Sequence, residues 1–379
     1  MTTPTIIPGR RLTDHLYSKA SRLRIPISGT FELSPVCNFD CRMCYVRKSQ
    51  KEVAQSPRKI LSLEEWRKIA VEAREAGMLY LLLTGGEPFL WPDFWTFYDE
   101  LIDMGFVISI NTNGSLIDEK AIEHLRRKPP QKINITLYGA SDATYQRLCG
   151  ADHVFSRVDQ AIRGLQDAGI PVRINCSLTP ENAGDLDWII DYAKERNTVL
   201  SVTTYMFPPV RRDPSQVGTN ERFTPEESAG YTLHTVRRQQ GEDRYRYHLK
   251  RILDGYIDPP GLDESCIDPI DGRVRCRAGS ASFWITWDGW MTPCGMMPEP
   301  KVDVRSGSFA EVWHRLTEET AALKLSGTCA SCPNRNVCHA CAAMAMTETG
   351  SASGIPTYLC KTAQHMQKIA RETLFPGET

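Results

Sequence analysis

The chain has 379 residues with 45 basic and 46 acidic side chains, and its net charge of -1 excludes the strongly basic balance of a nucleic-acid-binding protein. With 41% hydrophobic and 24% charged residues it can bury a sizeable core, which excludes a disordered chain. No stretch approaches the roughly 20 apolar residues that span a bilayer, and residues 1–10 lack the apolar core of a secretory signal, so we expect a soluble, cytoplasmic protein without a membrane partner.

Short apolar runs rich in strand-forming residues alternate with amphipathic helical segments in the first half of the chain. The runs are 27–33, 79–84, 106–111, 132–137, 172–178 and 199–205. Such strand–helix repeats predict a parallel sheet with right-handed crossovers. We therefore expect an α/β fold, a partial (β/α)6 TIM-like barrel, whose functional groups gather at the carboxyl ends of the strands.

Helix starts are marked by capping residues between these runs. Ser62 and Glu65 form a capping box before a helix that should end at Gly77, and Asp93 precedes a helix that should end at Gly105. Less distinct starts occur at Asp118, Ser141 and Glu181.

The pattern changes after Tyr205, and three units are expected: a core at 22–207, a bridge at 208–261, and a small cysteine-rich domain at 262–370. The bridge should contain a helical stretch from about Pro225 to Gly255 and supply substrate-specific contacts, while Arg211 and Arg212 are interpreted as solvated. The cysteine-rich part is expected to gain order from bound metal.

Three cysteines, Cys37, Cys41 and Cys44, lie in one loop directly after the first predicted strand. Thiolates select zinc, copper or iron–sulfur centres, and three ligands from one loop leave a metal position open. The alternative is a structural zinc whose fourth ligand comes from elsewhere.

The Cys-x3-Cys-x2-Cys spacing, with Tyr45 after the last cysteine, resembles the hallmark of the radical S-adenosylmethionine (SAM) superfamily. The resemblance implies that Cys37, Cys41 and Cys44 hold three irons of a 4Fe-4S cluster and that SAM chelates the fourth. It further implies one-electron cleavage of SAM to a 5'-deoxyadenosyl radical, which takes a hydrogen atom from substrate. A reductase or a flavodoxin- or ferredoxin-type donor would supply the electron.

Other strand ends also resemble the family's SAM-binding segments. Gly85-Gly86-Glu87-Pro88 follows the second strand and Asn113 follows the third. Alternation places Thr136 on one face of the fourth strand, which the resemblance implies lines the barrel, and we assign the polar face of the fifth strand, with Asn175, inward as well. Arg147 resembles an arginine that pairs with the SAM carboxylate, although a solvated arginine is the alternative reading. The cofactor-binding set is thus Tyr45, Gly85, Gly86, Glu87, Asn113, Thr136, Arg147 and Asn175. Cys149 and Cys176 are interpreted as structural.

The C-terminal cysteines resemble the SPASM (twitch-like) domain, which carries two auxiliary 4Fe-4S clusters. Mapping by order assigns the first cluster to Cys266, Cys276, Cys294 and Cys341, and the second to Cys329, Cys332, Cys338 and Cys360. Only two residues separate Cys338 from Cys341, where the family usually has three. The alternative is a zinc-ribbon-like site made by Cys329, Cys332, Cys338 and Cys341.

The resemblance favours an oxidoreductase-type enzyme that modifies a ribosomally made (RiPP) peptide by a cross-link, a thioether or epimerisation. The short stretch before the first strand suggests that a separate protein delivers the peptide, or that the substrate is a small molecule such as a sugar. Sulfatase maturation is a rival, but Gly295 follows Cys294 where those enzymes carry an aspartate. A non-enzymatic iron–sulfur carrier is the alternative of a different class.

Overall fold

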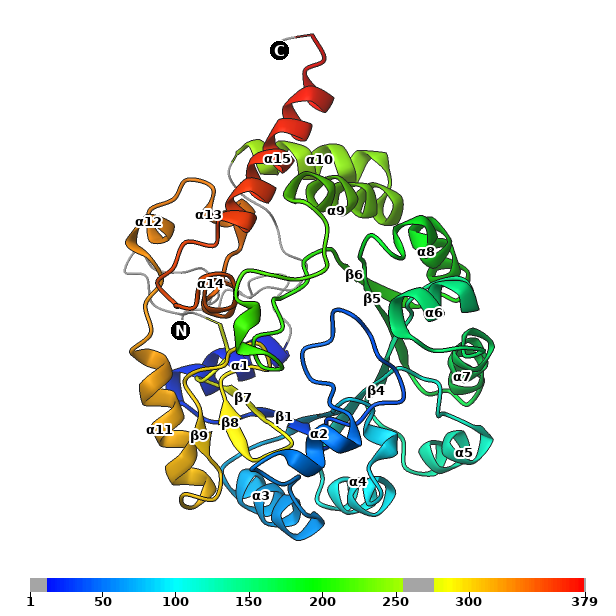
Figure 1. Cartoon of the computed structure of the whole chain (residues 1–379), viewed down its shortest axis with the longest axis vertical. Coiled ribbons are helices and arrows are strands. Elements are labelled where there is room, and N and C mark those ends of the chain that lie inside the picture. The colour runs from blue at the N-terminus through cyan, green and yellow to red at the C-terminus, as the bar shows by residue number, and fades with distance from the viewer. Residues whose placement is uncertain (1–11, 255–275, 378–379) are drawn as a thin grey trace, which may run out of the picture.

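The computed structural model describes residues 12–254 and 276–377, and their central feature is one sheet of nine strands in the order β6-β5-β4-β3-β2-β1-β7-β8-β9. Neighbouring strands from β1 to β6 pair in parallel. Their bounds agree with those of the predicted runs to within two residues: β1 (Ser28–Glu32), β2 (Tyr80–Thr84), β3 (Val107–Thr112), β4 (Lys132–Thr136), β5 (Val172–Ser177) and β6 (Val199–Thr203). The predicted partial barrel is confirmed (Figure 1).

Helices cover the outer face of these strands (Figure 1), and their caps explain where they begin. Ser62 forms the predicted capping box, and the side chains of Asp118 and Ser141 also accept N-cap hydrogen bonds. Glu181 does not start a helix. A short 3-10 turn at Ala183–Asp185 follows it and leads into the next helix. The outer helices are α3 (Leu63–Glu75), α4 (Phe94–Asp103), α5 (Glu119–Arg127), α6 (Asp142–Cys149), α7 (Phe155–Asp167) and α8 (Leu186–Glu195).

Aromatic side chains fill the space between the sheet and these helices. Phe31 on β1 stacks on Trp66 of α3 with 4.8 Å between ring centroids, and both side chains are fully buried. Phe97 of α4 stacks on Phe31 at 6.5 Å. Burial of rings of this size is a main source of stability for such a sheet.

The C-terminal part continues the sheet instead of forming a separate layer. β7 (Ser282–Ile285) pairs in parallel with β1, and β8 (Trp290–Thr292) and β9 (Val302–Asp303) follow in antiparallel order. Helix α11 (Phe309–Ala321) packs against α3, and its Trp313 donates a hydrogen bond to the Arg24 carbonyl at 2.7 Å. The C-terminal part and the barrel are therefore joined by backbone pairing and by a shared core.

A helical layer closes the other end of the sheet, where α9 (Pro225–Gln240), α10 (Glu242–Leu253) and α15 (Thr357–Leu374) pack together (Figure 1). The single helical stretch predicted from Pro225 is instead two helices, because Gly241 takes a φ of +83° between them. The remaining helices are α1 (Leu12–Leu23), α2 (Gln50–Gln55), α12 (Gly327–Ala330), α13 (Arg335–Cys338) and α14 (Ala342–Thr349).

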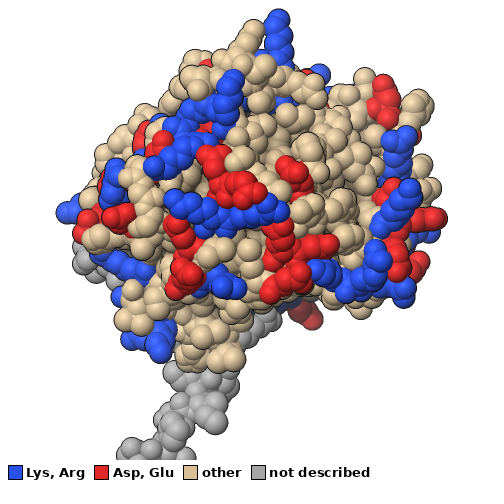
Figure 2. Space-filling model, turned by 90° about the horizontal axis from the view of Figure 1, so that it is seen from below, with Lys and Arg blue, Asp and Glu red and all other residues tan. Residues whose placement is uncertain are grey.

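Charges of both signs mix on the molecular surface. Figure 2 shows the face nearest α3 and α4, where basic and acidic side chains alternate. Arg67 of α3 pairs with Glu64 on its own helix and with Glu100 of α4. Within the described residues, we find no helix with the length and apolarity to cross a bilayer.

Candidate active site

A cavity of about 340 Å³ lies at the carboxyl ends of the parallel strands. Each of the six strands contributes to its wall, either through its last residues or through the loop that follows. The main contributors are the cysteine loop after β1 (Cys37, Cys41, Cys44, Tyr45, Arg47), strand-end residues (Thr84, Gly85, Gly86, Asn111, Thr112, Asn113, Thr136, Tyr138, Ser177, Thr203) and Tyr205, Phe207 and Met296. The three predicted cluster ligands therefore face one shared space.

Backbone amides point at two of these three sulfurs. The Phe39 N–H donates to Cys37 Sγ at 3.3 Å, and the Arg47 N–H donates to Cys44 Sγ at 3.3 Å. Such hydrogen bonds favour the thiolate form that binds iron. Burial nevertheless raises the pKa of Cys37 to about 12, so metal binding at this loop must displace a proton.

The Gly85-Gly86 turn is fastened to the base of the cysteine loop. Gly86 N–H donates to the Ser34 carbonyl at 2.7 Å, and Glu87 N–H donates to the Val36 carbonyl at 2.9 Å. A Cβ atom on Gly86 would lie 2.5 Å from the Val36 carbonyl oxygen, which is closer than Cβ atoms are found in proteins. Because these residues are glycines, the two backbone segments can pack more closely than any side chain would allow. The three thiols lie next to this contact. The closely packed glycine turn and the three thiol ligands fit a 4Fe-4S cluster that has one iron without a protein ligand.

Glu87 lies behind the cavity wall and is fully buried. Its carboxylate accepts hydrogen bonds from the Thr112 hydroxyl at 2.8 Å and from the Asn113 N–H at 2.9 Å. Burial raises the pKa of Glu87 to about 7. Asn113 itself lines the cavity, and its amide donates to Asn38 at 2.9 Å inside the cysteine loop. In the structure Glu87 therefore positions Asn113 and does not itself reach the cavity.

The other residues predicted to bind SAM divide into two groups. Tyr45, Gly85, Gly86 and Thr136 line the cavity with Asn113. Asn175 pairs in register with Thr136 but is not part of the wall, which takes Ser177 from the same face of β5 instead. Arg147 is not among the residues that line the cavity: it donates to the Glu181 carbonyl at 3.2 Å, and 53% of its side chain is exposed.

The end of the predicted core, just before the bridge, contributes residues that the sequence did not assign to the site. Tyr205 and Phe207 line the cavity directly after β6, and the Tyr205 hydroxyl donates to Glu348 of α14 at 2.6 Å. The expectation that Arg211 is solvated is wrong, because only 12% of its side chain is exposed and it pairs with Glu32 at 2.9 Å. The available hint in the sequence is that aromatic residues follow the polar residues near the end of the 199–205 run. This pattern does not show which way the aromatic side chains point.

The C-terminal cysteines within the described residues form two neighbourhoods. Cys294 and Cys341 pack against one small apolar cluster, and burial together with the nearby Cys341 raises the pKa of Cys294 to about 11. Burial and negative charge on three neighbouring cysteines raise the pKa of Cys338 to about 11; the three are Cys360, Cys329 and Cys332. Cys276 is exposed, and Cys266 lies outside the described residues. Within the described ranges, no three Cys, His, Asp or Glu side chains are arranged to hold a single metal ion.

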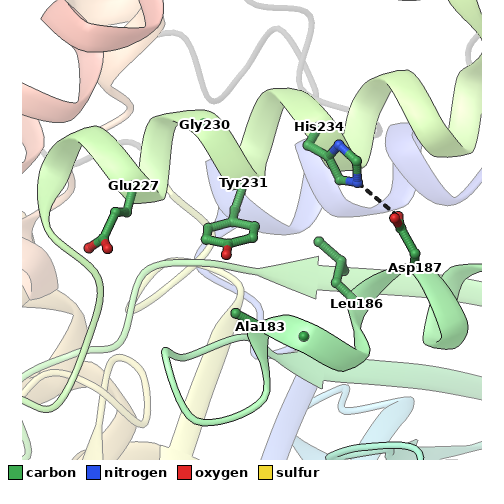
Figure 3. A pocket seen from close by; sticks show the side chains of 8 residues that line it. Ala183, Leu186, Asp187, Glu227, Gly230, Tyr231 and His234 are labelled. Atoms are coloured by element: carbon green, nitrogen blue, oxygen red, sulfur yellow. Dashed lines mark hydrogen bonds and ion pairs between the residues drawn. The ribbon is translucent and has the colours of Figure 1, made fainter.

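A second hollow, of about 440 Å³, lies on the outside of the barrel between α9 and the start of α8 (Figure 3). Its wall includes Leu186 and Tyr231, and His234 donates its Nε2–H to the Asp187 carboxylate at 2.8 Å. Asp187 also accepts from Arg238 at 2.9 Å, so the His234–Asp187 pair belongs to an ion-pair network that joins α8 to α9. No cysteine is among the described residues that line this hollow.

Comparison with known proteins identifies relatives by sequence and by structure. The profile of the Radical SAM superfamily matches residues 31–193. An AdoMet-dependent heme synthase of Methanosarcina barkeri is 26% identical over 334 residues, which cover 84% of this chain and 92% of that protein. A probable GTP 3',8-cyclase of Sulfurisphaera tokodaii is 32% identical over 278 residues, covering 72% and 82%.

Solved structures with a similar fold include SuiB of Streptococcus suis bound to S-adenosylmethionine. It has a TM-score of 0.63 and 16% identity, with 95% of this chain and 83% of that chain covered. The anSMEcpe enzyme with bound AdoMet has a TM-score of 0.65 and 18% identity, with 92% and 98% covered. At these identities the likeness establishes the fold.

Proposed function

Because the chain belongs to the radical SAM superfamily and is thus a radical SAM enzyme, we propose that it modifies a ribosomally made peptide by a cross-link, a thioether or epimerisation. The observation that carries this proposal is the cavity shared by Cys37, Cys41 and Cys44 with the ends of all six parallel strands. When bound there, a 4Fe-4S cluster and SAM supply hydrogen-abstracting radical chemistry.

The chain's own residues hold and shield this chemistry. Cys37, Cys41 and Cys44 would ligate the cluster, and the Gly85-Gly86 turn lines the same cavity with exposed backbone that would bind SAM. Thr136 and Asn113 present neutral polar groups to the ligand, and a ring of aromatic and thioether side chains excludes water. The ring consists of Phe39, Met43, Tyr45, Tyr138, Tyr205, Met206, Phe207 and Met296.

The charge of the wall supports a peptide over a polycarboxylate. Among the described lining residues only Arg47 is ionic at neutral pH, and it already pairs with Asp40 at 2.9 Å. A neutral amide backbone suits such a wall, whereas each additional buried carboxylate would need a partner cation. One structural neighbour, SuiB, is solved bound to its precursor peptide SuiA, and anSMEcpe is solved with bound peptides.

A small-molecule oxidation is the second candidate, and one observation favours it. The heme synthase of Methanosarcina barkeri aligns over 92% of its own length, so the likeness extends into the C-terminal part. A sulfatase-maturase-like reaction is less well supported. The residue after Cys294 is Gly295, whose Cβ would lie 2.9 Å from three ring atoms of Trp284, so no carboxylate fits at that position.

We further propose that the C-terminal cysteines hold two auxiliary 4Fe-4S clusters. The neighbourhoods of Cys294 with Cys341, and of Cys338 with Cys329, Cys332 and Cys360, support the division predicted by order. Cys266 and Cys276 would complete the first cluster. An external reductase, flavodoxin or ferredoxin would supply electrons, and a separate protein would deliver the peptide.

The test is anaerobic reconstitution followed by incubation with SAM and dithionite. We expect about twelve irons per chain, four for each cluster, and release of methionine and 5'-deoxyadenosine. Deuterated peptides and, in separate reactions, deuterated heme precursors are then offered as hydrogen donors. If deuterium enters 5'-deoxyadenosine from a heme precursor and from none of the peptides, the peptide proposal is overturned. Absence of SAM cleavage by iron-loaded protein would leave only a carrier.

A further inference from the structure

A buried ion pair lies where β1 leads into the cysteine loop. Glu32, the last residue of β1, is fully buried, and Arg211 from the bridge donates to both of its carboxylate oxygens at 2.9 and 3.1 Å. Trp284 of β7 donates its indole N–H to the same carboxylate at 2.9 Å. Three segments that are distant in sequence thus converge on one carboxylate.

The Arg211 guanidinium contacts both cysteine loops. It donates to the Gly295 carbonyl at 2.7 Å, and Gly295 directly follows Cys294. It also lies 5.7 Å from the ring centroid of Tyr45, which directly follows Cys44. One positive charge therefore sits between the loop that holds Cys44 and the loop that holds Cys294.

The packing fixes this charge in place. The backbone of Gly295 lies on the ring of Trp284 so closely that no methyl group fits between them, and the indole in turn holds Glu32. Arg211 cannot rotate towards solvent without leaving Glu32 as an unpaired buried charge. The pair is consequently preorganised before any cluster binds.

We propose that Glu32 and Arg211 are positioning residues that set the reduction potential of the auxiliary cluster at Cys294, a role that rests on the proposed auxiliary clusters. One-electron reduction adds a negative charge to that cluster. A guanidinium with little solvent screening stabilises the added charge, and the Glu32 carboxylate opposes it. The two side chains therefore act on the potential with opposite signs, while both hold the same loops together.

The test is an EPR-monitored redox titration of the reconstituted full chain. Alanine substitution of Cys37, Cys41 and Cys44 together identifies the auxiliary signals. Arg211→Met should lower the auxiliary potential, and the reduced-to-oxidised ratio at fixed potential should fall at least tenfold, which corresponds to about 59 mV for one electron. Glu32→Gln should shift the potential upwards. Arg211→Lys should restore most of the wild-type value.

Two controls keep the proposal falsifiable. Arg126→Met and Glu123→Gln remove members of an exposed pair on α5 and should leave the potentials unchanged. If Arg211→Met does not fold, the double variant of Glu32→Gln with Arg211→Met removes both charges and should show a potential below that of Glu32→Gln alone, because the guanidinium is then missing.

Shifts of the same sign in the Glu32→Gln and Arg211→Met variants, or no shift in either, would overturn the electrostatic role. A wild-type chain that binds only about four irons would instead remove the auxiliary cluster itself. That result would refute the proposed clusters, and it is read from iron content before any variant is titrated.

Discussion

Gly86→Ala is the substitution for which the structure gives the most direct magnitude. The added Cβ would lie 2.5 Å from the Val36 carbonyl oxygen, 2.6 Å from that of Pro35 and 2.7 Å from the Val36 carbonyl carbon. All three are backbone atoms, so no side chain can rotate away. Overpacking costs roughly 1–3 kcal/mol, and we expect a value near the upper end. With about 2.1 cal/mol/K per residue over the whole chain, about 3 kcal/mol lowers Tm by about 4 °C.

Calorimetry of the apoprotein, paired with iron analysis after reconstitution, measures this effect. Because Gly86 is hydrogen-bonded to the base of the cysteine loop, we expect the variant to lose up to four irons while keeping the remainder. Gly230→Ala in α9 is the matched control, since nothing lies within 4 Å of its Cβ, and helix propensity predicts a gain of up to about 1 kcal/mol. A Gly86→Ala chain that melts with the wild type and binds all its iron would refute the close-packing argument.

Three further outcomes are expected from denaturant titrations of the apoprotein. Burial raises the pKa of Glu87 from 4.5 to about 7, so the folded state binds a proton that the unfolded state lacks, and stability should fall by about 3 kcal/mol as pH rises between these values. Glu87→Gln should remove that slope. Glu348→Gln leaves Arg222 buried and unpaired and should cost about 3–5 kcal/mol, whereas Glu123→Gln on the surface should leave the stability nearly unchanged, and equal losses would contradict the burial argument.

Local patterns predicted the barrel because each strand and helix carries its own signal. The six apolar runs became β1 to β6, and the caps at Ser62, Asp118 and Ser141 start helices as expected. The cysteine loop could also be placed, since it follows β1 and strand ends converge in a parallel barrel. Alternation together with the family resemblance predicted Thr136 on the wall of the cavity, where it lies.

Contacts between distant segments could not be predicted in this way. Arg211 resembles a surface residue in a charged stretch, and only folding brings it within 2.9 Å of Glu32, which is 179 positions earlier in the chain. Arg147 shows the reverse: its place in the helix after β4 suggested a ligand contact, yet Glu181 holds it outside the cavity. The direction of a long side chain depends on neighbours that sequence periodicity does not identify.

The pairing of β7 with β1 determines how the two sets of cysteines relate. Thr30 of β1 is in register with Trp284 of β7, so the residue that ends β1 and the indole that binds it are fixed by adjacent strands. Cys37, Cys41 and Cys44 lie in the loop after β1, and Cys294 follows β8, which is paired with β7. The separation between the two loops is thus set by backbone hydrogen bonds within one sheet, which a flexible linker could not maintain. Electron transfer depends steeply on distance, so this shared sheet is the feature that would make a fixed auxiliary cluster useful to the radical site.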